Sequence, residues 1–106
     1  MLAHNVFFTL KDASPAEKRK LVEASKKYLA PIPGIVFFAC GPLEEDLARP
    51  VNDREFHVAL HVVFGDRKSH DDYQNDPLHN QFIDQCRPNW AKVRVFDSTV
   101  EGAQPG

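Results

Sequence analysis

Four short segments carry the residue patterns of β-strands, and four strands in so short a chain restrict the fold more than any other feature. Residues 2–11, 56–64 and 91–97 alternate with period two, as a strand with one covered face does. Residues 35–40 are apolar at every position, which is typical of a strand covered on both faces. On the first strand, one polar residue, His4, interrupts the face formed by Leu2, Val6, Phe8 and Leu10.

Two helix starts lie between these strands. Ser14-Pro15-Ala16-Glu17 is a capping box with proline at the first helical position, and Asp76-Pro77 repeats the combination of cap and proline. The first helix ends at residues 31–34, Pro-Ile-Pro-Gly, and the second runs to Cys86. A short additional helix is expected over residues 69–73. Basic residues and one glutamate cover the solvated side of the first helix: Lys18, Lys20, Glu23, Lys26 and Lys27.

The order of elements is therefore βαββαβ. This order predicts an α+β, ferredoxin-like fold, in which helices cover one face of a four-stranded antiparallel sheet. We expect one domain over residues 1–100, a flexible tail over 101–106, and a long acidic loop between the second and third strands. The other sheet face carries Phe7, Ala59 and Val63. Exposing such apolar area costs about 25 cal/mol per Å², so a twofold homodimer with facing sheets is predicted.

The composition excludes several kinds of protein. Thirteen basic and fifteen acidic residues among 106 give a net charge of −2, so no basic excess indicates binding to nucleic acid or to an anionic membrane. The longest apolar run is too short to span a bilayer, and the first residues lack the pattern of a signal peptide. Two cysteines are too few for a disulfide framework, which favours a reducing, cytoplasmic location.

Five motifs in this order resemble the stress-responsive dimeric α/β-barrel (Dabb) family over residues 2–99. They are the His-bearing first strand (residues 3–8), Ile-Pro-Gly-Ile (32–35), Phe-His-Val-Ala-Leu (56–60), Asp-Tyr-Gln-Asn-Asp-Pro-Leu-His (72–79) and Val-Phe-Asp (95–97). Polyketide cyclases similar to this family have a Tyr-x-x-x-Pro-x-His arrangement, which Tyr73 and His79 match, and a first-strand histidine, which His4 matches. The resemblance implies a pocket between sheet and helices with these three as catalytic residues; Val6, Phe8 and Tyr28 are expected to line it.

The chemistry expected of such a pocket is proton abstraction next to a carbonyl group, including aldol-type ring closure. The helix N-terminus lowers the pKa of His79 and Asp76 raises it, so a neutral His79 could act as the base. Tyr73 could donate a hydrogen bond to the carbonyl oxygen, and His4 would orient the substrate or the Tyr73 hydroxyl. This predicts a cyclase or lyase for a small hydrophobic or polyketide-like molecule, with no cofactor and no metal. The alternative is a non-enzymatic ligand-binding or stress-associated dimer. In such a dimer the same residues only hold the fold, and His4 is hydrogen-bonded to His79 or to a backbone carbonyl.

Other candidate sites are weaker. A haem-degrading or antibiotic-biosynthesis-type monooxygenase would use an asparagine, a tryptophan and a histidine, but Asn5 alternates away from His4 and Trp90 lies past the helix. His57 and His61 are about 13 Å apart along one strand and cannot share a metal within one chain, so we place them at the dimer interface. We expect His70 at a solvated helix start. Neither Cys40 nor Cys86 lies near a recognisable base, which argues against a catalytic thiol.

Overall fold

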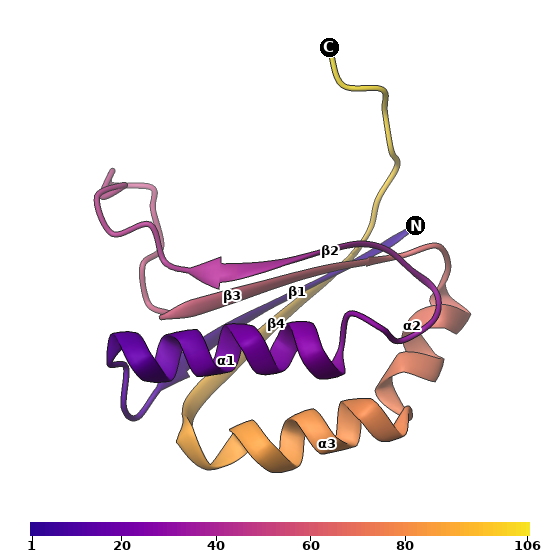
Figure 1. The fold of residues 1–106 in the computed structure, drawn as a ribbon. Coiled ribbons are helices and arrows are strands. Elements are labelled where there is room, and N and C mark those ends of the chain that lie inside the picture. The colour runs from indigo at the N-terminus through magenta and orange to yellow at the C-terminus, as the bar shows by residue number, and fades with distance from the viewer.

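The computed structural model describes residues 1–106, in which four antiparallel strands form one sheet with all helices on one face (Figure 1). The strand order is β2-β3-β1-β4, so β1 pairs with both β3 and β4. This is the predicted βαββαβ, ferredoxin-like arrangement. The elements are β1 (Leu2–Leu10), α1 (Pro15–Tyr28), β2 (Ile35–Pro42), β3 (Val58–Phe64), α2 (Arg67–Gln74), α3 (Pro77–Cys86), a 3-10 turn η1 (Arg87–Asn89) and β4 (Trp90–Thr99).

The helices begin where side chains cap them. The Ser14 hydroxyl accepts a hydrogen bond from the backbone N–H of Glu17, and the Asp76 carboxylate accepts one from Leu78, as the sequence predicts. The short helix α2 is longer than expected. It begins at Arg67 because Asp66 caps it by accepting from the backbone N–H of Ser69 at 2.8 Å.

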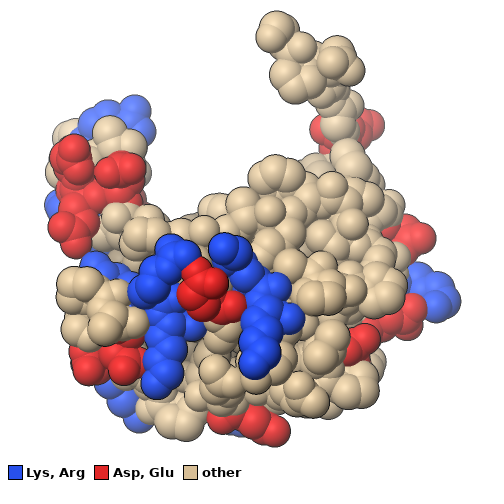
Figure 2. Space-filling model, viewed as in Figure 1, with Lys and Arg blue, Asp and Glu red and all other residues tan.

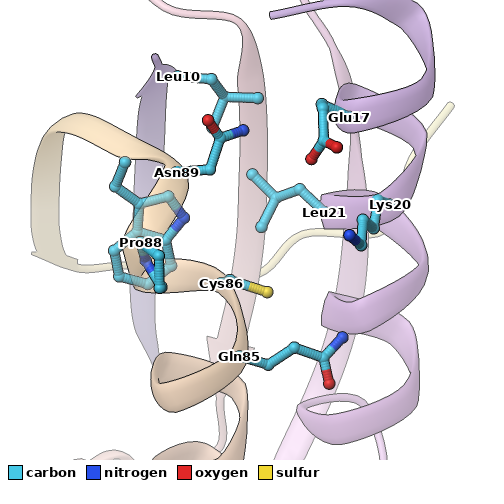
Figure 3. A pocket seen from close by; sticks show the side chains of 9 residues that line it. Leu10, Glu17, Lys20, Leu21, Gln85, Cys86, Pro88 and Asn89 are labelled. Atoms are coloured by element: carbon cyan, nitrogen blue, oxygen red, sulfur yellow. The ribbon is translucent and has the colours of Figure 1, made fainter. Parts of the chain in front are cut away.

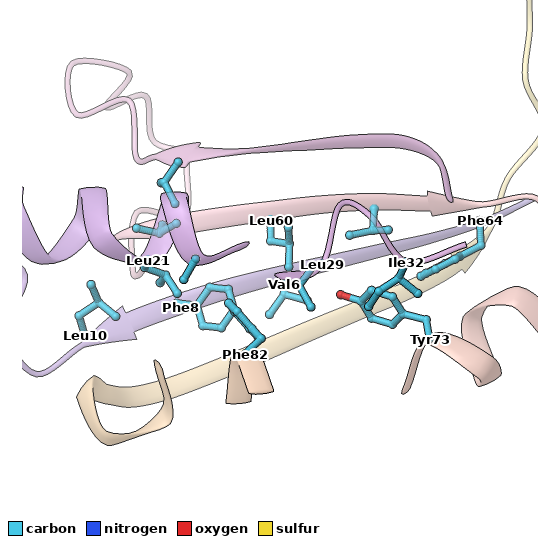
Figure 4. Packing of buried hydrophobic residues seen from close by; sticks show 14 residues of the cluster. Val6, Phe8, Leu10, Leu21, Leu29, Ile32, Leu60, Phe64, Tyr73 and Phe82 are labelled. Carbon is cyan, nitrogen blue, oxygen red and sulfur yellow. The ribbon is translucent and has the colours of Figure 1, made fainter. Parts of the chain in front are cut away.

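The hydrophobic core fills the space between the sheet and the helices. Phe8 and Leu60 point from the sheet toward the helices, where Leu29, Phe82 and Tyr73 meet them (Figure 4). The α1 face opposite the core carries basic side chains interspersed with acidic ones, as expected (Figure 2). None of the helices has the length and apolar character needed to cross a membrane.

The second face of the sheet is bare in a single chain, as the sequence predicts. Phe37 of β2 lies opposite Val63 on this face and is 55% exposed, and Val36 stands at an irregularity in the β2–β3 pairing and is 58% exposed. Phe56 was expected on the helix-facing side, but β3 begins only at Val58, and Phe56 lies on the bare face against Phe7, with ring centroids 4.9 Å apart.

Two segments extend past this bare face. The acidic loop between β2 and β3 and the C-terminal residues 100–106 both rise on the side of the sheet that the helices leave uncovered (Figure 1). In the space-filling view they stand apart, with an open hollow between them (Figure 2). The loop also exposes apolar side chains, since Leu47 is 53% and Val51 83% exposed.

Gly34 lies between α1 and β2, and two constraints require glycine at this position. Its φ of +94° is the only positive one in the chain, and a Cβ there would lie 2.6 Å from the Ser69 side chain of α2. We expect Gly34→Ala to lower the free energy of unfolding by about 2–4 kcal/mol, since it adds backbone strain to a steric clash. Urea unfolding followed by circular dichroism measures the change.

Gly41→Ala, near the other end of β2, is the matched control. A Cβ at Gly41 meets nothing within 4 Å, and φ there is not positive. This variant should stay within about 1 kcal/mol of the wild type. Equal losses in the two variants would contradict the explanation.

Candidate functional site

An apolar cavity of about 160 Å³ lies between the sheet and the helices α2 and α3. Ten of its thirteen lining residues are hydrophobic. Val93 and Val95 of β4 line it and are 38% and 49% exposed, so the cavity opens to solvent along this edge strand. The lining residues are His4, Val6, Phe8, Leu29, Leu60, Tyr73, Gln74, His79, Phe82, Ile83, Trp90, Val93 and Val95.

The floor of the cavity follows from the register between β1 and β4. Val6 is opposite Val95, and Phe8 is opposite Val93. Because alternate residues of a strand face the same side, the inward face of β1 and that of β4 form one continuous apolar surface. The same register places His4 opposite Asp97 at the end of that surface.

His4 is held by a carboxylate that the sequence analysis did not assign to the site. The Nδ1 atom of His4 lies 2.6 Å from Oδ1 of Asp97. This corrects the expected partner, which was His79 or a backbone carbonyl. A hydrogen bond to the carboxylate places the proton on Nδ1 and leaves Nε2 of a neutral imidazole as an acceptor. His4 is only 5% exposed, and Asp97 therefore fixes the orientation of a buried ring.

Tyr73 and His79 meet at the break between α2 and α3. Their ring centroids are 4.9 Å apart, and the Tyr73 ring lies 6.0 Å from that of His4. Pro77 and the Asp76 cap end one helix and begin the next here, which turns both side chains toward the cavity. The structure thus brings together the three residues predicted as catalytic, His4, Tyr73 and His79, together with the predicted lining residues Val6 and Phe8.

Burial determines the protonation states of His79 and Tyr73 at neutral pH. It lowers the pKa of His79 below the ordinary 6.5, and the neighbouring His4 adds to this, whereas Asp76 partly opposes it. Burial raises the pKa of Tyr73 far above its ordinary range. At neutral pH the cavity therefore holds a neutral imidazole beside a protonated phenol.

Two polar atoms in the cavity wall have no partner in the protein. They are Nδ1 of His79 and Nε1 of Trp90, both buried. A buried polar group without a hydrogen bond costs about 1–3 kcal/mol, so such groups are rare in native proteins. Both belong to residues that line the cavity, where a polar atom of a bound molecule could satisfy them.

Tyr28, Asn5 and His57 do not line the cavity. The Tyr28 hydroxyl donates a hydrogen bond to Gln85 at 2.8 Å, between α1 and α3, so Tyr28 does not line the cavity as expected. Asn5 lies on the bare sheet face, as its alternation predicts, with its side-chain oxygen 2.8 Å from His61 Nδ1. His57 accepts a hydrogen bond from the backbone N–H of Leu10.

His70 differs from its expected position at a solvated helix start. Its side chain is only 15% exposed. The ring packs on Phe64 and lies 5.2 Å from the ring of His4, measured between centroids. Helix α2 therefore turns this residue inward, toward the end of the cavity that His4 forms.

A second hollow of about 170 Å³ lies between α1 and the end of α3 (Figure 3). Glu17, Lys20 and Gln85 point into it, and it is more polar than the first cavity. Burial raises the pKa of the Cys86 thiol at its wall to about 11. A thiol with that pKa is protonated at neutral pH, which agrees with the argument against a catalytic cysteine.

The sequence analysis missed Asp97, Gln74 and most of the apolar lining. The signal for Asp97 was present, because positions 93, 95 and 97 alternate onto one face. Extending that face by one residue and setting it beside β1 would have placed Asp97 next to His4. No comparable signal exists for Gln74, whose position depends on where α2 ends.

The fold and cavity define a ferredoxin-like α+β domain with a ligand-sized apolar site between sheet and helices. The chain belongs to the stress responsive A/B barrel domain (Dabb) family, whose model matches residues 2–100. A Dabb family protein with a ferredoxin-like fold from Mesorhizobium loti is similar, with 28% identity, a TM-score of 0.78, and coverage of 95% of this chain and 97% of that one.

Two further structures share the fold at lower identity. A dimeric ferredoxin-like protein of unknown function from Thermobifida fusca has 21% identity and a TM-score of 0.78, covering 93% of this chain and 90% of that one. A hydroxynitrile lyase from Passiflora edulis has 20% identity and a TM-score of 0.75, with 98% and 96% covered. Comparison with the curated proteins gives no significant match.

The depressed pKa of His79 predicts a pH dependence of stability. Between the folded pKa and the ordinary 6.5, the unfolded chain binds more protons than the folded chain, so stability falls as pH drops below 6.5. His79→Gln should lose less stability than the wild type over this interval. Urea unfolding from about pH 7.5 to 5 tests this, and an NMR titration midpoint of His79 at or above 6.5 would contradict it.

Proposed function

We propose that the cavity binds a small carbonyl compound and abstracts a proton from the carbon next to the carbonyl group. The observation that carries the proposal is the unpartnered Nδ1 of His79, buried in the wall of an apolar cavity and 4.9 Å, ring to ring, from the protonated Tyr73. A neutral base and a hydrogen-bond donor to oxygen are the minimum machinery for this reaction.

In the proposed step, His79 takes the proton from the α-carbon. The electron pair of that C–H bond forms a carbon–carbon double bond, and the carbonyl π electrons move onto oxygen. Tyr73 donates a hydrogen bond to this oxygen, where the negative charge develops, and its elevated pKa keeps its proton in place. The enolate carbon then takes a proton back from His79, or it attacks a second carbonyl carbon, as in ring closure. In that case the π electrons of the second carbonyl move onto its oxygen, which takes the proton from His79 and returns the base to its neutral form. His4, oriented by Asp97, positions the substrate or the Tyr73 hydroxyl.

The size of the cavity limits the substrate. A cavity of about 160 Å³ is comparable to one of about 150 Å³ that holds benzene. We therefore propose a compound of about one ring, or the carbonyl end of a longer polyketide-like chain that enters along β4. A hydroxynitrile lyase shares this fold, so the architecture is compatible with lyase chemistry. The proposal itself rests on the residues of this chain.

A second candidate function is ligand binding without turnover. The His4–Asp97 hydrogen bond favours it, because this pair also ties β1 to β4 and has a structural role whether or not a reaction occurs. In this case the cavity sequesters a small apolar molecule, and the polar groups only orient it.

We further propose that the functional unit is a homodimer formed through the bare sheet face. Phe37 and Phe96 are 55% and 53% exposed there, and burial of such rings is strongly favourable. The acidic loop and the C-terminal segment, which rise on this side, would lie along the partner (Figure 1). The Thermobifida protein of the same fold is described as dimeric, which agrees with this arrangement.

Deuterium exchange at the α-carbons of cyclohexanone in D₂O tests the proposed chemistry. The wild type should accelerate this exchange, and His79→Gln should reduce the acceleration by about 10²–10⁴-fold because it removes the base. Tyr73→Phe should reduce it by about 10–10³-fold, because it removes one hydrogen bond to the developing oxyanion. NMR spectroscopy measures both rates.

The controls separate the two candidate functions. Tyr28→Phe is the matched control for Tyr73→Phe, since Tyr28 lies off the cavity, and it should exchange at the wild-type rate. Binding of cyclohexanone, seen as chemical-shift changes of cavity residues, without accelerated exchange would support the non-enzymatic function. Absence of both binding and exchange would contradict the proposal for this class of compound.

Sedimentation equilibrium tests the dimer. The wild type should have twice the mass of one chain at micromolar concentration, and Phe37→Asp should weaken association at least about tenfold, because it places a charge in an apolar interface. Ala16→Asp, a charge added on the exposed helical side, is the control and should leave the dimer intact. A monomeric wild type would refute the assignment.

A further inference from the structure

At the end of the cavity that His4 forms, three residues from distant parts of the chain form a cluster of metal-ligating side chains. His4 of β1, His70 of α2 and Asp97 of β4 each offer one ligand atom, and these atoms all lie within 4.8 Å of one another. We propose that the three residues bind a divalent transition-metal ion, with Zn²⁺ the best match to two imidazoles and one carboxylate. This inference does not rest on the proposed reaction.

The distances are close to those of a formed site. Ligands about 2.0–2.1 Å from a tetrahedral zinc ion lie about 3.4 Å from one another. His4 Nδ1 and Asp97 Oδ1 are 2.6 Å apart, so a cation that replaced the proton between them would move the two atoms about 0.8 Å further apart. Since all three ligand atoms lie within 4.8 Å of one another, His70 would have to approach by at most about 1.4 Å to reach the spacing of a tetrahedral site.

A further carboxylate orients the third ligand. Asp71 Oδ1 lies 2.9 Å from Nδ1 of His70. A carboxylate that accepts the proton of one ring nitrogen leaves the other nitrogen free to coordinate a metal, and metal-bound histidines almost always donate their second ring N–H to a carboxylate, a backbone carbonyl or water. Nε2 of His70 is therefore the coordinating atom. Asp71 also accepts a hydrogen bond from Arg67, which holds the carboxylate in place.

The exposure of the three side chains provides a path for the ion. The Asp97 side chain is 46% exposed, whereas the side chains of His4 and His70 are 7% and 15% exposed. An ion from solvent would reach Asp97 first and then the two shielded imidazoles. Three protein ligands leave a fourth tetrahedral position for water or another ligand, as in catalytic zinc sites.

Titration of the full chain with ZnCl₂, followed by isothermal calorimetry, tests the site. We expect one ion per chain and at least a 100-fold weaker affinity for His70→Ala. Asp71→Asn should weaken binding about 10–100-fold, because it removes only the orienting carboxylate. Asp72→Asn is the matched control: this neighbouring carboxylate pairs with Lys68, away from the cluster, and its loss should leave zinc affinity unchanged.

A second measurement is made on the wild type alone, so it does not depend on whether the variants fold. Added Zn²⁺ should shift the imidazole NMR signals of His4 and His70 in the wild type and leave those of His57 and His61 in place. Failure to bind one ion per chain, or equal affinities in the wild type and in a folded Asp71→Asn, would overturn the inference. The α-proton exchange of cyclohexanone is measured separately in chelator, so loss of the zinc site and loss of the proposed reaction are distinguishable.

Discussion

The pairing of β1 with both β3 and β4 is the constraint on which the rest of the molecule depends. Because residues of a strand alternate between faces, every side chain of this central strand is assigned to one of two environments. His4, Val6 and Phe8 face the helices and form the cavity floor. Asn5 and Phe7 face the bare side, where Asn5 meets His61 and Phe7 packs on Phe56. A register shift by one residue would exchange the two sets and remove the cavity.

Features encoded locally could be predicted from the sequence. The period of two marks β1 and β3, and the Ser14 and Asp76 caps with their prolines place the starts of α1 and α3. Tyr73 and His79 could be paired because only five residues separate them. The residues that were misplaced depend on contacts between distant segments. Tyr28 turns toward Gln85 of α3, His70 packs inward on Phe64, and Asp97 reaches His4 across 93 residues.

The buried polar residues of the cavity differ in whether they have a hydrogen-bond partner within the protein. Asp97 accepts from His4, so burial of that histidine is compensated within the protein. Nδ1 of His79 has no such partner, although it is buried. An uncompensated buried group reduces stability, and proteins retain such groups chiefly where a ligand or a reaction needs them. In the proposed reaction, His79 at the break between α2 and α3 would therefore act on the substrate, whereas the His4–Asp97 pair at the other end of the cavity is already hydrogen-bonded within the protein.

The two faces of β1 also link the cavity to self-association. The helix-facing side is completed by this chain's own helices, so one subunit contains a whole cavity. The opposite side carries Phe7 of β1 and Phe96 of β4, whose rings pack 5.7 Å apart. Phe96 is next to Asp97 in sequence, and Phe7 is three residues from His4. In the proposed dimer, a partner covering these rings would press the same two strands together. Covering the bare face would thereby fix the β1–β4 register that brings His4 to Asp97, so association would stabilise the site without contributing a residue to it.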